Sequence, residues 1–230
     1  MKITYLTLGL IFLYQISFAE PQIFKSIGAK VIEERDLGSL MEYVIGKNGR
    51  KMIVYETKDG KYLIIGALLD AKSGKNLTKE RYKEINKVGF SKIPLDEALH
   101  IRFGKGGKKL VMISDPECPF CRRAHRYLKE KNVDLYVFLF PLDIHPNAYK
   151  KSVKILCFKD KAKAYDEALS GKEINAKECK KGENLLKKHI LIGQMLGVRG
   201  TPLFVKENGE KIEGFVVSEL EEYLGGNKNE

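Results

Sequence analysis

The chain has 230 residues, 43% of them hydrophobic, which is enough for one or two globular domains and excludes a disordered protein. Its 41 Lys and Arg outnumber its 30 Asp and Glu, for a formal net charge of +11. No basic-aromatic platform, finger or recognition-helix pattern accompanies this charge, so the composition argues against a nucleic-acid-binding protein. We interpret the charge as a source of solubility and of modest attraction to acidic partners.

The first 19 residues have the pattern of a secretory signal peptide. Met1-Lys2 is followed by an apolar stretch, Ile3 to Phe18, and then by the small residue Ala19. We therefore expect cleavage before Glu20 and export to an oxidising compartment, where disulfides persist. An uncleaved membrane anchor is the alternative, which the short and interrupted apolar stretch disfavours.

The next segment predicts a small antiparallel sheet. Pro21–Lys30 is expected to be a short helix or an irregular entry, and the pattern from Val31 to about Ser73 is typical of β-strands. Asn48-Gly49 and Asp59-Gly60 are strong two-residue hairpin signals, the second of them preceding a strand at Tyr62–Ile65. A sheet of this size has edges and a face to cover, so we expect an interaction module.

A charged helix is predicted from Leu77 to Val88, with Thr78 as its N-cap and Gly89 at its end. Its apolar stripe is narrow. The helix fits two roles equally well: a rigid spacer between domains, or a helix packed on the first sheet.

A second domain is predicted from about Ile93, with a β-α-β order around a pair of cysteines. Its elements are an edge strand at Ile101–Phe103, a buried strand at Lys109–Ile113, a helix at Arg122–Lys129 and a strand at Asp134–Phe140. A mostly helical region over 147–194 follows, and then a strand at Leu203–Val205, a turn at Asn208-Gly209, a strand at Lys211–Glu213 and a helix at Ser218–Leu224.

The segment Ser114–Cys121 carries a C-x-x-C pair, Cys118 and Cys121, where the buried strand leads into the helix. A cysteine in the first turn of a helix faces unpaired backbone N–H groups and the positive end of the helix dipole, and both favour the thiolate. We therefore predict that Cys118 is a redox nucleophile with a lowered pKa. Cys121, one turn further in and more enclosed, is predicted to be the resolving thiol.

The helix dipole alone lowers a pKa by less than about one unit, so a strongly acidic thiol also needs hydrogen bonds and cations near its sulfur. Four side chains of the helix could supply the cations: Arg122, Arg123, His125 and Arg126. The carboxylates of Asp115 and Glu117 would act in the opposite direction. The sequence therefore predicts a lowered pKa without fixing its size.

Two other roles for the C-x-x-C pair are less favoured. Half a zinc site usually requires a second close pair of Cys or His, and Cys157 and Cys179 are far apart in the sequence. A merely structural bridge would close too small a loop to constrain the unfolded chain. Three histidines lie in no metal spacing, and we interpret them as structural: His100, His145 and His189. We expect neither a metal nor a cofactor.

Cys157 and Cys179 complete an even cysteine count and suggest a structural disulfide in an exported protein. Closing a loop of roughly 20 residues would stabilise the native state by about 3 kcal/mol on chain-entropy grounds. Two buried free thiols are the alternative.

The segment Gly200-Thr201-Pro202 stands just before the C-terminal hairpin. A proline that opens a strand beside a thiol site predicts a cis Thr201–Pro202 bond. Backbone groups of Thr201 would then be available to an extended peptide substrate.

These motifs resemble the periplasmic disulfide isomerase family, which includes DsbC and DsbG, over nearly the whole length after residue 19. The matching segments are Asp115–His125, Phe140-Pro141, Cys157–Asp160, Ala164–Asp166, Ser170–Lys172, Cys179, Leu196–Pro202, Asn208-Gly209 and Gly214. The resemblance implies an α+β fold with a small antiparallel, cystatin-like dimerisation domain over 20–76. A linker helix over 77–92 and a C-terminal thioredoxin-like α/β domain with a helical insertion over 93–230 would follow.

The resemblance also implies roles for single residues. Cys118 would be the attacking thiolate and Cys121 the resolving thiol, Pro202 would be a cis proline with Thr201 beside the substrate, and Cys157–Cys179 would be a structural disulfide. The protein would be a V-shaped periplasmic homodimer that reshuffles wrong disulfides in misfolded exported proteins. A membrane thiol reductase of the DsbD type would keep it reduced.

One departure from the family pattern concerns the dipeptide between the cysteines, Pro119-Phe120, where the isomerase typically has Gly-Tyr. These residues tune the redox poise of the pair, and a proline there is closer to DsbG and to oxidases. A reductase of oxidised single cysteines and a dithiol oxidase are therefore alternatives. A dimeric holdase chaperone, whose cleft binds unfolded chains, is a further alternative from another functional class. His125 matches a histidine of the family. Because we expect its helix turn to be exposed, a solvated side chain without a special role is an equally good interpretation.

Overall fold

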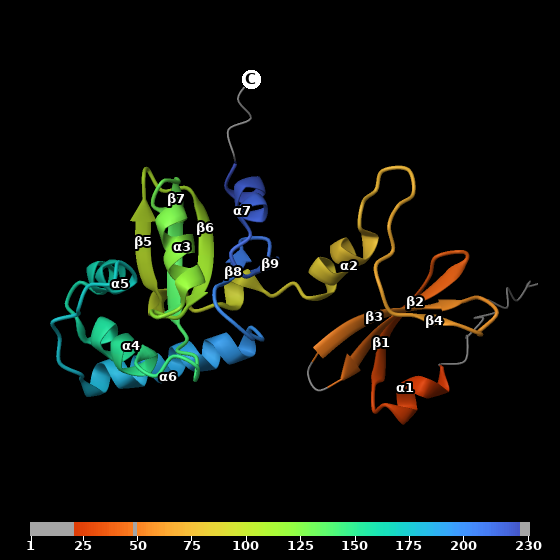
Figure 1. The fold of residues 1–230 in the computed structure, drawn as a ribbon, viewed down its shortest axis with the longest axis horizontal. Helices are drawn as coiled ribbons and strands as arrows, with labels where there is room; N and C mark the ends of the chain where they lie inside the picture. The colour runs from red at the N-terminus through yellow and green to blue at the C-terminus, as the bar shows by residue number, and fades with distance from the viewer. Residues whose placement is uncertain (1–20, 48–49, 226–230) are drawn as a thin grey trace, which may run out of the picture. The chain divides into compact units, whose positions relative to one another are not determined.

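The computed structural model describes residues 21–47 and 50–225, and the chain divides into two compact units, one up to Tyr82 and one from Lys83 onward (Figure 1). The predicted signal peptide, residues 1–19, and the Asn48-Gly49 turn lie outside the described residues. Within the described part of the chain, no helix combines the length and the apolar character that crossing a bilayer requires.

The first unit is a four-stranded antiparallel sheet in the order β1-β2-β3-β4, preceded by a short helix (Figure 1). Its elements are α1 (Gln22–Ser26), β1 (Lys30–Asp36), β2 (Leu40–Lys47), β3 (Arg50–Thr57) and β4 (Leu63–Ile64). β2 pairs with β3 from Leu40↔Thr57 to Lys47↔Arg50, which is the register of the predicted two-residue hairpin. β4 is shorter than predicted, and Tyr62 and Ile65 on either side of it are 66% and 74% exposed.

The central strand β2 is buried on both faces. On one face the ring of Phe24 from α1 packs edge-on against Tyr43, with ring centroids 5.4 Å apart. On the other, Glu42 is 2% exposed and receives hydrogen bonds from Arg81 Nε and Arg35 Nη2, each at 3.0 Å. Arg81 lies on helix α2 (Leu77–Ile85), so the first turns of this helix pack on the sheet through a buried ion pair.

The predicted cap of α2 is wrong. Thr78 lies inside the helix, where its hydroxyl is 2.6 Å from Tyr55 Oη and accepts the N–H of Leu68 at 2.8 Å. The capping oxygen is Asn76 Oδ1, which accepts the N–H of Lys79 at 2.8 Å. Both Asn and Thr are favoured N-cap residues, so the sequence alone does not distinguish them. Contacts with the sheet decide which of the two caps the helix.

The second unit holds a five-stranded sheet in the order β5-β7-β6-β8-β9, with β6 and β7 parallel and the other pairs antiparallel (Figure 1). Its strands are β5 (Leu99–Phe103), β6 (Lys108–Ser114), β7 (Val133–Leu139), β8 (Leu203–Lys206) and β9 (Lys211–Glu213). Its helices are η1 (Phe90–Lys92), η2 (Leu95–Glu97), α3 (Pro119–Leu128), α4 (Ala148–Cys157), α5 (Lys161–Leu169), α6 (Lys180–Met195) and α7 (Val217–Leu224). The predicted β-α-β order and the helical insertion are confirmed.

Strand β6 lies at the centre of this sheet, and side chains from both of its faces enter a core. Leu110 and Met112 join the core formed with α3, α4 and α5, while Val111 and Ile113 join the core formed with α6. Burial on both faces explains the uninterrupted apolar run in the sequence. Because both of its faces are packed, the strand fixes the position of the segment that follows Ser114.

Candidate active site

Cys118 lies where β6 passes into α3, at the N-cap of that helix, with Pro119 in its first turn. A short turn shapes this approach: the N–H of Cys118 bonds to Asp115 O at 3.2 Å, and the N–H of Glu117 bonds to Asp115 Oδ1 at 2.7 Å. Proline suits this position because the first-turn N–H has no intrahelical partner in any case. The predicted placement of Cys118 at a strand-to-helix junction is confirmed.

Hydrogen bonds lower the pKa of the Cys118 thiol to about 5, and the largest contribution comes from the Cys121 thiol. Burial acts in the opposite direction, and Thr201 and the backbone N–H groups of Cys121 and Phe120 add to the lowering. The charged form is favoured because these donors bond more strongly to a thiolate than to a thiol. As a thiol, Cys118 donates to Thr201 O at 3.2 Å.

Hydrogen bonds, and not the cations that the sequence offers for this role, are the main causes of the low pKa of Cys118. Arg123 stacks over the rings of Phe120 and Phe215, at 5.8 Å from each centroid. The two carboxylates of the turn are also engaged elsewhere. Asp115 Oδ2 accepts the N–H of Leu142 at 2.7 Å and lies 2.9 Å from His145 Nδ1.

Glu117 forms an ion pair with Lys151, which lowers the pKa of its carboxyl group.

Cys121 is completely buried, whereas Cys118 is 4% exposed. Burial raises the pKa of Cys121 well above its usual value, and the neighbouring Cys118 raises it further. Two groups oppose this shift, the backbone N–H of Asp115 and the side chain of Ser114. The two sulfurs therefore differ as a nucleophile and a resolving thiol must: one ionises easily near the surface, and the other stays protonated inside.

The Thr201–Pro202 peptide bond is cis, as the sequence predicts. The loop before β8 carries it to the active site, because β8 pairs with β6 through Ile113↔Leu203. Pro202 O accepts the N–H of Gly214 at 2.8 Å. Thr201 thus lies directly against Cys118, although 83 residues separate them in the chain.

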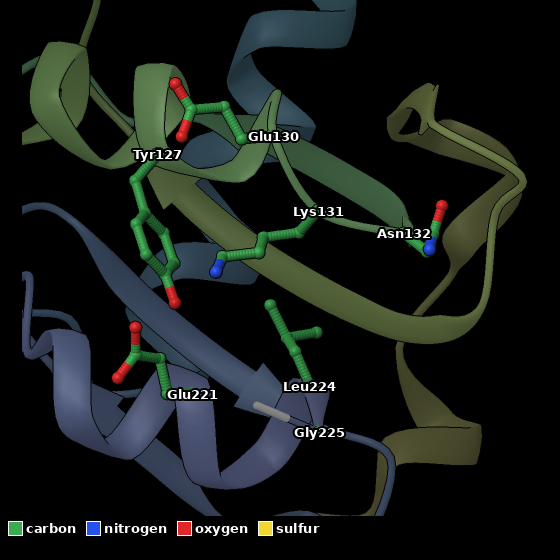
Figure 2. Close-up of a pocket in the computed structure, with 7 residues that line it drawn as sticks. All are labelled: Tyr127, Glu130, Lys131, Asn132, Glu221, Leu224 and Gly225. Carbon is green, nitrogen blue, oxygen red and sulfur yellow. The ribbon is translucent and has the colours of Figure 1, made fainter. Parts of the chain in front are cut away.

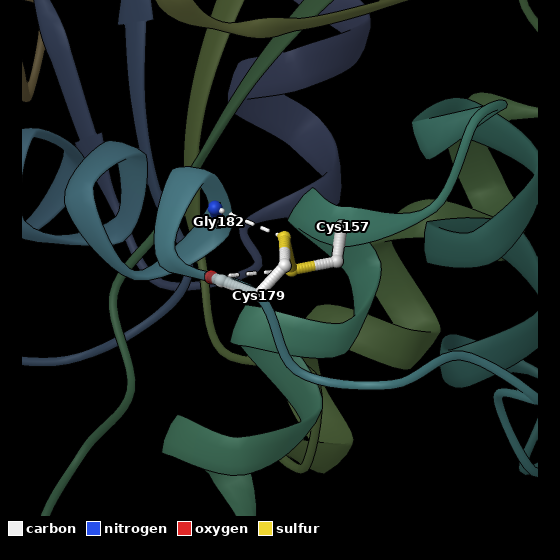
Figure 3. The surroundings of a disulfide bond; sticks show 3 residues. All are labelled: Cys157, Cys179 and Gly182. Atoms are coloured by element: carbon white, nitrogen blue, oxygen red, sulfur yellow. Dashed lines mark hydrogen bonds between the residues drawn. A yellow bond between two sulfur atoms is a disulfide. The ribbon is translucent and has the colours of Figure 1, made fainter.

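Cys157 and Cys179 form a disulfide that joins the end of α4 to the start of α6, with a Cα–Cα distance of 5.8 Å (Figure 3). Cys179 Sγ also caps α6 by accepting the N–H of Gly182 at 3.3 Å. A Cβ at position 182 would lie 2.4 Å from Cys157 Sγ, so only glycine fits there.

The expectation of an exposed His125 is wrong. This side chain is 3% exposed, its Nε2 lies 2.8 Å from Asp166 Oδ1, and its ring packs edge-on against Tyr165. Burial lowers the pKa of His125. His189 is also buried, between the N–H of Leu139 and the carbonyl of Glu97. Among the described residues, no three His, Cys, Asp or Glu side chains gather as metal ligands would.

A surface pocket of about 260 Å³ lies between the end of α3 and α7, and neither Cys118 nor Cys121 lines it (Figure 2). Its lining residues are Tyr127, Glu130, Lys131, Asn132, Glu221, Leu224 and Gly225. None of the candidate site residues lines it, and within its wall Lys131 Nζ lies 4.7 Å from the Tyr127 ring centroid.

Two residues of the site, Ser114 and Tyr165, were not predicted from the sequence. Their hydroxyl groups are 2.6 Å apart, and both residues are fully buried next to Cys121. The sequence holds a partial signal for each. Ser114 is the polar end of an apolar strand, and Tyr165 lies in a segment quoted above for its resemblance to the isomerases.

Comparison with known protein families agrees with this arrangement. Residues 24–79 match the N-terminal domain of disulfide bond isomerase proteins, and residues 95–225 match the thioredoxin-like domain.

Among curated proteins, the chain is similar to a probable thiol:disulfide interchange protein DsbC of Bordetella avium, with 31% identity over 75% of this chain and 62% of the relative. The DsbC of Escherichia coli K12 is 28% identical over 80% of this chain and 76% of its own length. The chain thus spans about three fifths of the Bordetella relative.

Among solved structures, a disulfide interchange protein from Neisseria gonorrhoeae is 29% identical, with a TM-score of 0.53, over 60% of this chain and all of that one. A linker-deletion variant of Proteus mirabilis ScsC, 18% identical with a TM-score of 0.52, shares the fold.

Proposed function

Because the chain belongs to the DsbC family of thioredoxin-like thiol:disulfide interchange proteins, we propose that its Cys118–Cys121 pair isomerises wrong disulfides in exported proteins. The observation that carries this proposal is the contrast between the two thiols. Cys118 has a pKa of about 5 at the surface end of the site, and Cys121 is buried with a raised pKa directly behind it. An isomerase needs this combination, because it must attack in the reduced form and still be able to release itself.

The chemistry proceeds in two exchanges. The Cys118 thiolate attacks one sulfur of a substrate disulfide, a bond forms between the two, and the other substrate sulfur leaves as a thiolate. That thiolate can then attack a different disulfide of the substrate and finally displace Cys118, so that the pairing changes with no net oxidation. Alternatively, Cys121 loses its proton and attacks Cys118, which releases a reduced substrate and leaves the enzyme pair oxidised by two electrons.

We assign substrate contact to Thr201 and Pro202, because this loop lies against the Cys118 sulfur. An apolar groove of about 450 Å³ beside the turn after β7 is a second candidate surface, and it contains Phe140, Tyr149 and Ile190. It adjoins the redox site through the His145–Asp115 contact. Extended, misfolded segments with exposed apolar side chains are the substrates that such a surface suits.

We further propose that the protein works in the periplasm as a homodimer and is reduced by a membrane thiol reductase of the DsbD type. This proposal includes cleavage after residue 19 and three segments that follow it: a dimerisation domain over 20–76, a linker helix over 77–92 and a catalytic domain over 93–230. It is supported by the match of residues 24–79 to the isomerase N-terminal domain and by the open edge of the first sheet at β4.

Pro119-Phe120 supports a second candidate, a DsbG-like reductase of oxidised single cysteines or a net dithiol oxidase. A thiol with a low pKa is a good leaving group, so a strongly acidic Cys118 makes the Cys118–Cys121 disulfide more oxidising. Phe120 is 53% exposed and therefore also presents a ring to the substrate.

Refolding of a scrambled multi-disulfide protein by the reduced enzyme tests the proposal, with the Cys118→Ala variant as the control. We expect recovery of substrate activity that depends on Cys118. Rapid oxidation of a reduced substrate without recovery of the scrambled one would instead assign the protein to the oxidases. Sedimentation of the purified protein tests the homodimer, and a monomer would contradict it.

A further inference from the structure

Two buried hydroxyl groups stand behind the resolving cysteine. Ser114 closes β6, Tyr165 projects from α5, and neither side chain has exposed surface. Tyr165 Oη donates to Ser114 Oγ at 2.6 Å and lies 3.9 Å from Met112 Sδ. Because the Ser114 oxygen already accepts this proton, its own hydroxyl proton remains available as a donor, and the Ser114 side chain lowers the pKa of the Cys121 thiol.

The resolving step needs such donors. Once Cys118 is held in a mixed disulfide, it is no longer a thiolate that can accept a hydrogen bond from Cys121. Cys121 must then ionise in a buried site, where burial raises its pKa. The backbone N–H of Asp115 acts in the opposite direction and lowers this pKa.

Two ionisable side chains near this site form hydrogen bonds in other directions. The Asp115 carboxylate, at the end of β6, faces Leu142 N–H and His145. On α3, His125 Nε2 faces Asp166 of α5. The two groups that lower the pKa of Cys121, the Asp115 backbone N–H and the Ser114 side chain, are both neutral.

We propose that Ser114 and Tyr165 form a hydroxyl pair that stabilises the Cys121 thiolate as it forms, and so sets how fast the mixed disulfide is resolved. In this proposal Ser114 donates a hydrogen bond to the forming thiolate, and Tyr165 acts through Ser114 as a positioning residue. This inference rests on the proposed thiol-disulfide exchange.

In the resolving step the Cys121 proton passes to water. The Cys121–Cys118 bond forms as the bond from Cys118 to the substrate sulfur breaks, and the leaving substrate thiolate takes a proton from water. The pair is oxidised by two electrons and the substrate is reduced by two. The hydroxyl pair gains and loses no proton overall.

The hydroxyl pair would determine the balance between isomerisation and reduction. A slow resolving step leaves the mixed disulfide time to rearrange within the substrate, and a fast one releases a reduced substrate. The same fold could therefore be moved between the two activities by changes at positions 114 and 165, without any change in the C-x-x-C dipeptide.

The test separates the two exchanges. The reduced full-length protein is mixed with glutathione disulfide, quenched with acid at intervals and weighed by mass spectrometry, which gives the rates at which the mixed disulfide forms and decays. The variants are Ser114→Ala, the rescue variant Ser114→Thr and the packing-conserving Tyr165→Phe. Tyr136→Phe is the matched control, because this tyrosine stacks on His100 at the opposite side of the sheet from the cysteines' core.

We expect Ser114→Ala to slow the decay at pH 7 about tenfold, because a hydrogen bond to a charged sulfur is worth about one pKa unit or more. Tyr165→Phe should slow it by about threefold, through the loss of cooperativity along the hydroxyl chain. Ser114→Thr and Tyr136→Phe should match the wild type. In Ser114→Ala the pH profile of the decay should shift upward by about one unit and reach the same plateau, while mixed-disulfide formation stays unchanged.

Equal decay rates in Ser114→Ala, Tyr165→Phe and the wild type would overturn the inference and leave the proposed function standing. A lowered plateau with no shift of the pH profile would overturn it too, since it would indicate damage to the packing. If the wild type formed no mixed disulfide at all, the proposed function would fail along with the inference.

Discussion

Replacement of Cys121 by alanine should raise the pKa of Cys118 markedly, because the Cys121 thiol is the largest single cause of its low value of about 5. A hydrogen bond to a charged group contributes about 1.5–3 kcal/mol, and one pKa unit corresponds to about 1.4 kcal/mol. Loss of this donor should therefore move the pKa to about 6–7. At pH 7 the thiolate fraction would fall from about 99% to between about 50% and about 90%.

The assay is the rate of alkylation of the reduced protein by iodoacetamide as a function of pH, with the modified residue located by mass spectrometry. Cys157 and Cys179 do not interfere, because they are joined in a disulfide. Cys121→Ser is the matched control. It retains a hydroxyl donor at the same position, so its Cys118 pKa should lie between those of the wild type and Cys121→Ala.

Two results would refute this reasoning. A Cys118 pKa near 5 in Cys121→Ala would mean that backbone N–H groups and Thr201 suffice to stabilise the thiolate. A wild-type pKa near the ordinary value of 9.0 would mean that burial outweighs all the donors, and Cys118 would then be a poor nucleophile at neutral pH.

Three further predictions concern stability, measured by urea unfolding followed by circular dichroism. Arg81→Met should destabilise the first unit by about 1.5–3 kcal/mol, since the buried Glu42 carboxylate loses its Nε partner and keeps only Arg35; a loss below about 0.5 kcal/mol would contradict a buried pair. The double variant Cys157→Ala, Cys179→Ala should lose about 3 kcal/mol, as expected for a loop of 22 residues, and an unchanged midpoint would show that this bridge adds nothing. Burial lowers the pKa of His189 below 6.5, so the unfolded chain binds a proton more readily than the folded one. The free energy of unfolding should therefore fall as the pH drops below about 6.5. His189→Gln should flatten this pH dependence, and an equally steep curve in that variant would mean that other groups cause it.

Local patterns in the sequence were sufficient to predict most of the fold and the position of the reactive cysteine. The apolar run before Ser114 predicts a central strand, and the helix-forming residues after Cys118 predict the helix. Such predictions succeed because strand burial and helix initiation depend on residues close together in the chain. The cis bond before Pro202 was predictable for a related reason, since the thiol motif and the proline motif are both short and specific.

The tertiary structure alone decided which side chains contact the sulfurs and which turn away. His125 is buried because α5 brings Asp166 and Tyr165 against α3, and nothing within its own helix indicates this. Asn76 caps α2 instead of the predicted Thr78, because the Thr78 hydroxyl is hydrogen-bonded to Tyr55 of β3.

The hydroxyl pair behind Cys121 is the clearest case. Ser114 and Tyr165 are 51 residues apart, and each looks ordinary in its own segment. The sequence by itself determined that Cys118 would lie at the start of a helix, after a buried strand. How acidic it is, and how its partner is released, depend on hydrogen bonds between distant segments, whose geometry is fixed only when the layers pack.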